Sequence, residues 1–145
     1  MKKIAIKYGL WMFAGFVAFF LTMHLLGLSH RYFFRIFNGV FHIAAIYYAI
    51  REYRKQNEDS INNYVSGVAM GVYTSAVGVL GFTIFMLLYL AFDTGFMEHL
   101  RAAMPIGEYL NPITASLFIL TEGIVVSLIG SYLVTRVIDM NLANA

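Results

Sequence analysis

The stretch INNYVSGVAMGVYTSAVGVLGFTIFMLLYLAF, residues 61–92, decides the class of this protein. It carries no charged residue, and it is long enough to cross a bilayer, since a helix needs roughly 20 apolar residues to span the hydrocarbon core. At about 1.5 Å per residue the run outreaches that core, so we expect the helix to tilt or to project into water. The sequence therefore predicts a membrane-spanning helix here.

Three further apolar runs accompany this stretch. They give expected spans at about residues 4–28, 33–50 and 112–137. Backbone groups must be paired inside a bilayer, and these continuous runs are roughly twice the length of an alternating barrel strand, so we predict helices. Asn111 and Pro112 are a suitable cap and first residue for the last helix. The predicted fold class is all-α, with one domain that forms an integral membrane four-helix bundle over residues 1–145.

The composition supports a bilayer as the solvent. Apolar residues make up 60% of the chain and charged residues only 12%, whereas an ordinary globular protein is about 25% charged. The net charge is only +2, and the basic residues lie at the ends of apolar runs, which argues against a nucleic-acid partner. The chain has no cysteine, which excludes disulfides, thiolate nucleophiles and cysteine-ligated metals.

The distribution of Lys and Arg predicts that both termini are cytoplasmic. With the N-terminus inside, seven basic residues fall on the inner side and three on the outer side. The inner ones are Lys2, Lys3, Lys7, Arg51, Arg54, Lys55 and Arg136, and the outer ones are Arg31, Arg35 and Arg101. Because cytoplasmic loops carry the excess of positive charge, this favours an N-in, C-in topology.

The outer loop between spans three and four predicts a short helix at the membrane interface. Phe96, Met97, Leu100 and Met104 would share one helical face, and Pro105 would end the helix. A lid over a cavity is the alternative interpretation of this segment.

Small residues predict where helices pack closely. Lipid tails are as apolar as leucine, so close approach at small residues holds membrane helices together. Such residues form stripes on spans three and four, at Gly67, Gly71, Gly78, Gly81, Gly123, Ser127 and Gly130. Packing within the bundle is one interpretation of these stripes, and homo-oligomerisation is the other.

Polar residues at membrane depth are the candidate functional site. Arg35, Asn38 and His42 share one face of span two, and Glu122 lies in the middle of span four. A charge at that depth costs roughly 2.5–3.5 kcal/mol on insertion scales, so we expect Glu122 to face the bundle interior. His42 is its first candidate partner by depth, and Asn38 is the second. The group either fixes helix register or handles protons or ions.

No sequence motif indicates catalysis or a cofactor. There is no GxSxG, HExxH, CxxCH or phosphate-binding glycine loop, so we predict neither an enzyme nor a metal site. Paired histidines can ligate haem, but His24 and His42 are expected at different depths. We therefore predict no cofactor.

A resemblance to a known family rests on residues 47–71, YYAIREYRKQNEDSINNYVSGVAMG. The order of an aliphatic span, I-R-x-Y-R, a short polar loop and S-G-x-x-x-G resembles the domain-of-unknown-function 4199 family of small bacterial inner-membrane proteins. Residues 1–10 and 111–136 are similar to the same group. That family often has a glycine-rich loop followed by S-F-G, where this chain reads NEDSINNYVSG. The resemblance implies a multi-pass protein of the bacterial inner membrane and carries no activity.

Two functions agree with these observations. The first is a non-catalytic packing, scaffold or accessory subunit, which would bind another membrane protein or a second copy of itself. The second is a small oligomeric transporter or channel, coupled to protons or ions through Glu122 and His42. Neither requires a partner other than the bilayer, a copy of the chain or another membrane protein.

Overall fold

Long helices make up the computed structural model, which describes residues 1–28 and 35–144, with residues 35, 61 and 62 described by their backbone alone. In chain order the elements are α1 (Lys2–Leu25), α2 (Arg35–Gln56), η2 (Glu58–Asn62), α3 (Tyr64–Phe92), α4 (Thr94–Ala103), η3 (Gly107–Tyr109) and α5 (Pro112–Ala143). The two η elements are short 3₁₀ helices. No strand occurs in the described part of the chain, so the predicted all-α class is confirmed.

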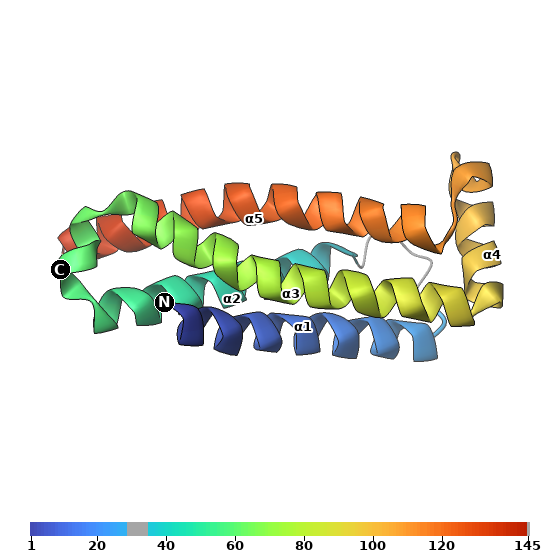
Figure 1. Ribbon diagram of the computed structural model, residues 1–145, viewed down its shortest axis with the longest axis horizontal. Helices are drawn as coiled ribbons and strands as arrows, with labels where there is room; N and C mark the ends of the chain where they lie inside the picture. The colour runs from blue at the N-terminus through green and yellow to red at the C-terminus, as the bar shows by residue number, and fades with distance from the viewer. Residues whose placement is uncertain (29–34, 145) are drawn as a thin grey trace.

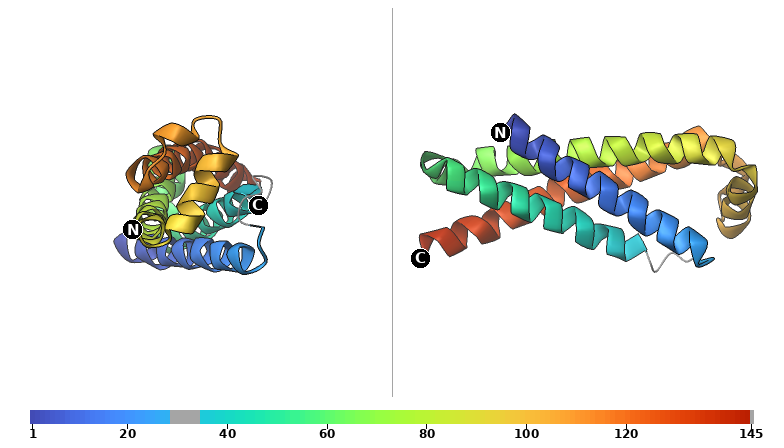
Figure 2. Two further views of the ribbon diagram at one scale, coloured as in Figure 1. Left: turned by 90° about the vertical axis from the view of Figure 1, so that its right-hand side faces the viewer. Right: turned by 90° about the horizontal axis from the view of Figure 1, so that it is seen from below.

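The four long helices α1, α2, α3 and α5 run lengthwise beside one another (Figure 1). α2 and α3 each pack against all three of the other long helices, and the contacts of α3 with α1 and α5 are the most extensive. α4 crosses one end of the bundle, and both termini lie toward the opposite end (Figures 1 and 2). These are called the α4 end and the terminal end below.

Three of these helices are long and apolar enough to cross a membrane. Within the described residues they are α1, α3 and α5, and they coincide with the expected spans 4–28, 61–92 and 112–137. α5 continues to Ala143, six residues beyond the expected end at residue 137. α2 has 22 residues and shares the bundle, although its last turns carry the polar sequence REYRKQ. Residues 33 and 34 of the expected second span lie outside the described part.

Side-chain caps fix where the helices begin. Asn111 Oδ1 accepts hydrogen bonds of 2.9 Å from the backbone N–H groups of Ile113 and Thr114. The Thr114 hydroxyl oxygen accepts one of 2.8 Å from the Asn111 N–H in return. This capping box pairs N–H groups that have no partner within the helix. The predicted start of the last helix at Asn111 and Pro112 is therefore confirmed.

The glycine stripe of α3 contacts all three of the other long helices. A Cβ on Gly71 would meet Ser131 of α5, whereas a Cβ on Gly78 would lie 2.5 Å from Met12 Sδ of α1. Of the other predicted packing residues, Gly67 faces Thr135, Gly81 faces Phe13, Gly123 faces Val79 and Gly130 faces Ile43. The glycines thus occupy contacts within the bundle, where any side chain would push two helices apart.

Candidate functional site

A buried arginine joins four elements at the terminal end. Arg54 is 1% exposed, and its guanidinium donates two hydrogen bonds, of 3.0 and 2.9 Å, to the two carboxylate oxygens of Asp139 on α5. It also donates to the Ser66 hydroxyl at 3.0 Å and to the backbone carbonyls of Ser60 and Asn63. A guanidinium is a rigid fork that suits a bidentate carboxylate. The Arg54 side chain therefore links four elements, α2, η2, α3 and α5.

Gly67 makes room for this guanidinium. A Cβ at that position would lie 2.7 Å from Arg54 Nη2 and 2.5 Å from Thr135 Cγ2. The second arginine of I-R-x-Y-R and the S-G that opens α3 are thus parts of one polar cluster. Sequence analysis missed it, since Arg54 lies in a charged stretch typical of a topology signal. Asp139, 85 residues further along the chain, gives no sequence signal that it is Arg54's partner.

His42 is a buried polar side chain in the middle of the bundle. It is 3% exposed, and its Nε2 lies 3.0 Å from the Ser75 hydroxyl of α3 and 3.2 Å from the Ser127 hydroxyl of α5. The Phe16 ring approaches it edge-on, with 5.8 Å between ring centroids. His42 therefore links α2 to both neighbouring helices.

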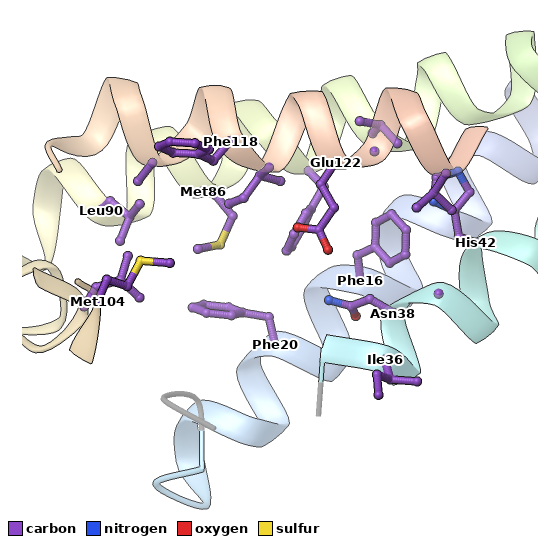
Figure 3. Close-up of a pocket in the computed structure, with 18 of the residues that line it drawn as sticks. Phe16, Phe20, Ile36, Asn38, His42, Met86, Leu90, Met104, Phe118 and Glu122 are labelled. Carbon is purple, nitrogen blue, oxygen red and sulfur yellow. The ribbon is translucent and has the colours of Figure 1, made fainter. Parts of the chain in front are cut away.

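The pairing of Glu122 with His42 stays a prediction, since the described hydrogen bonds of His42 are those with Ser75 and Ser127. Ser127 follows Glu122 by five residues on α5, which turns it about 140° around the helix. The two residues are near each other in depth but differ in direction. Ser127 points at His42, and Glu122 points into a cavity (Figure 3).

This cavity has a volume of about 610 Å³. It extends from His42 in the middle of the bundle to Leu100 and Met104 beneath α4 (Figure 3). Its lining comes from all five α-helices and the segment before α5, and consists of Phe16, Phe20, Ile36, Asn38, Gly39, His42, Val79, Phe82, Met86, Leu90, Phe96, Leu100, Ala103, Met104, Leu110, Ala115, Phe118, Ile119, Glu122, Gly123 and Val126. It is an apolar hollow with a few polar groups near its inner end.

The cavity collects three of the four predicted site residues. Asn38, His42 and Glu122 all line it. The Asn38 Oδ1 atom is buried and has no hydrogen-bond partner among the described residues. Arg35 begins α2, and its side chain lies outside the description. Within the described residues, no three His, Cys, Asp or Glu side chains could share a metal ion.

A second polar group lies at the α4 end. The Tyr89 hydroxyl is 2.9 Å from His24 Nε2 and donates to Asp93 Oδ2 at 3.0 Å. Asp93 Oδ1 caps α4 by accepting from the Phe96 N–H at 2.9 Å. The Phe96 N–H and the Tyr89 hydroxyl hold the pKa of Asp93 below its usual value, because both stabilise the carboxylate. These bonds attach α4 to α3 and α1.

Comparison with known proteins gives one match. The model of a family described as a protein of unknown function (DUF4199) matches residues 5–106. The chain belongs to the DUF4199 family. The match contains the I-R-x-Y-R and S-G-x-x-x-G motifs, so the DUF4199 segment includes Arg54 and Gly67 of the buried cluster. Neither the search of curated proteins nor that of solved structures found a match.

Proposed function

We propose that this protein is a four-span protein of the bacterial inner membrane, with both termini in the cytoplasm and α4 at the outer surface. The fourth span is α2, which lies alongside the other long helices in Figure 1. Its residues Ile46, Ala49 and Ile50 are 0% exposed, as expected for a helix held inside a bundle. The basic residues near its end support the cytoplasmic assignment of the terminal end.

The position of α4 agrees with an interfacial helix. It follows α3 directly and crosses the bundle axis (Figure 2). Met97 is 3% exposed and faces the bundle, while Glu98 and Arg101 are exposed. A short helix with one apolar and one charged face is suited to the boundary between lipid and water.

Within this topology we propose a non-catalytic role, as a packing, scaffold or accessory subunit. The observation that carries this proposal is the Arg54–Asp139 cluster. Its buried guanidinium forms its hydrogen bonds with neighbouring elements of the bundle and so holds them together. His42 also links helices, through its hydrogen bonds with Ser75 of α3 and Ser127 of α5. Rigid bundles of this kind can present their lipid-facing helices to another membrane protein or to a second copy of the chain.

The mass of the native assembly tests the accessory role. The chain should be extracted from its own membranes in a mild detergent and weighed by native mass spectrometry. We expect a defined complex at fixed stoichiometry, either with another membrane protein or as an oligomer. A uniform monomer of 16.4 kDa would contradict the proposal.

A second candidate, a small transporter or channel coupled to protons or ions, has one observation in its favour. Glu122 points into the cavity (Figure 3), and membrane-depth carboxyl groups mark many proton pathways. Flux across reconstituted vesicles, compared between wild type and Glu122→Gln, distinguishes this candidate. Equal or absent flux in the two proteins would rule it out.

A further inference from the structure

We propose that the cavity binds one neutral amphiphile, an apolar chain that carries a hydroxyl group, such as a long-chain alcohol or an alkylphenol. The hydroxyl would lie at Asn38 and Glu122, and the chain would extend along Met86 and Leu90 toward Met104. This site needs the membrane location of the chain but not its accessory role, so the two proposals can fail separately.

The apolar part of the cavity sets the nature of the chain. A volume of about 610 Å³ falls within the usual range of ligand sites, roughly 300–1,000 Å³. Phe20, Met86 and Leu90 form its wall toward the α4 end (Figure 3). An apolar lining of this kind favours contact with apolar ligand atoms over ordered water. The flexible Met86 and Met104 can adapt to chains of different shape.

The polar end sets the nature of the head group. Asn38 Oδ1 is a buried acceptor that lacks a donor among the described residues, and such an atom destabilises a fold until a donor reaches it. Glu122 adds carboxylate oxygens that face the same space (Figure 3). A carboxylate has about four lone-pair sites, so it can accept from a ligand besides its other contacts. Both groups require a head that donates hydrogen bonds.

The depth of these acceptors favours a neutral head over a phospholipid head group. Asn38 and Glu122 lie at the inner end of the cavity, near the middle of the bundle, and the apolar roof beneath α4 covers the outer end (Figure 3). A charged or zwitterionic head would have to reach the middle of the bilayer, which costs far more than moving one hydroxyl there. A single hydroxyl supplies the donor at the lowest cost.

The start of α2 offers the ligand a way in from the lipid. Ile36 and Gly39 line the cavity and also line a shallow outer groove that contains Ile43 and Val134. The groove and the cavity therefore lie next to each other at these two residues. A Cβ added to Gly39 would meet no atom within 4 Å. Since a Cβ fits at Gly39, we expect a larger side chain there to block the site while the helices keep their positions.

Binding of labelled 1-dodecanol to the full chain in phospholipid nanodiscs tests the proposal, with binding to empty nanodiscs subtracted. Unlabelled 1-dodecanol should compete about tenfold better than 1-methoxydodecane, which has no donor, because one hydrogen bond separates the two compounds. It should also compete better than dodecyltrimethylammonium. Equal competition by the ether, or stronger competition by the cation, would overturn the assignment of a neutral hydroxyl.

Two variants locate the binding. Gly39→Trp should weaken 1-dodecanol binding at least tenfold while the unfolding temperature stays near that of wild type. Ile84→Trp is the matched control, since Ile84 is 58% exposed on α3 and lines neither hollow. Asn38→Leu should abolish the preference for the alcohol over the ether and should not lower the unfolding temperature. Wild-type binding by Gly39→Trp, or a retained preference in Asn38→Leu, would overturn the proposed site.

Discussion

At the residue scale, the buried Arg54 guanidinium is the side chain whose partner matters most for stability. Replacing Asp139 by Asn keeps the shape of that partner and removes its negative charge. Breaking a buried ion pair on one side costs about 3–5 kcal/mol, so Asp139→Asn should lower the free energy of unfolding by that amount. Denaturant unfolding of the purified protein in detergent micelles would measure the loss.

The Lys7–Glu52 pair is the matched control for this variant. Its atoms are 2.8 Å apart, but the Lys7 side chain is 52% exposed, and exposed pairs contribute little. Lys7→Ala should therefore unfold like wild type. If Asp139→Asn did so as well, the buried cluster would not hold the terminal end together.

His42 and Glu122 should differ in their effect on stability. Removing the ring by His42→Ala leaves the Ser75 hydroxyl without its bond to Nε2, whereas Ser127 keeps its bond to the Gly123 carbonyl. A buried polar group without a partner costs about 1–3 kcal/mol. Glu122→Gln keeps the size of the side chain and its ability to form hydrogen bonds, so it should change the unfolding free energy much less. Thermal unfolding of both variants checks this, and equal losses would favour a shared structural role.

The sequence could predict the depth of these residues but not their direction. The position of a residue along a helix gives its depth, at about 1.5 Å per residue. Depth alone predicted that Asn38, His42 and Glu122 lie in one region, and all three line the same cavity. Which side chains touch depends on the rotation and crossing of whole helices. The sequence alone therefore favoured His42 as the partner of Glu122, where the structure has Ser75 and Ser127 beside His42.

At the element scale, the start of α4 should respond to acid. The pKa of Asp93 is lowered from the usual 3.8, first by the Phe96 N–H and then by the Tyr89 hydroxyl. A lowered folded-state pKa means that the cap stabilises α4 fully above the unfolded value and is lost as the pH falls through the folded one. The Phe96 amide resonance should therefore shift below about pH 4.

Asp93→Asn is the control for this titration. Asparagine can also cap a helix but carries no titrating carboxyl. The variant should keep the Phe96 amide signal constant over the same pH range. An identical shift in Asp93→Asn would show that another group causes it.

Two glycines should react in opposite ways to an added methyl group. In Gly71→Ala the new Cβ would meet Ser131 on α5, and overpacking of this kind costs about 1–3 kcal/mol. In Gly39→Ala the Cβ enters open space, and alanine is the better helix former. Unfolding free energies of the pair measure the difference; equal effects would contradict the close contact of α3 with α5.

Helix positions were well predicted because each is set by local sequence. The apolar runs of α1, α3 and α5 and the Asn111 cap act within a few residues. The cavity was not predicted, although a lid over one was considered for the α4 segment. Its shape depends on how five helices are spaced, and no run of residues encodes that spacing by itself.

At the scale of the whole molecule, the proposed topology can be tested by single-cysteine labelling, since the natural chain has no cysteine. Glu98→Cys on α4 should react with an impermeant maleimide in intact spheroplasts. Glu58→Cys and Asn144→Cys, at the terminal end, should react only after the membrane is opened. All three positions are exposed. The reverse pattern would contradict the N-in, C-in orientation.

The Arg54–Asp139 ion pair also constrains the order in which the helices can assemble during synthesis. Asp139 is made 85 residues after Arg54, a delay of roughly 4–17 s at 5–20 residues per second on the ribosome. Until then the guanidinium has no carboxylate from α5 to pair with. The terminal end of the bundle can therefore close only after α5 has been inserted, which makes α5 the helix that completes assembly.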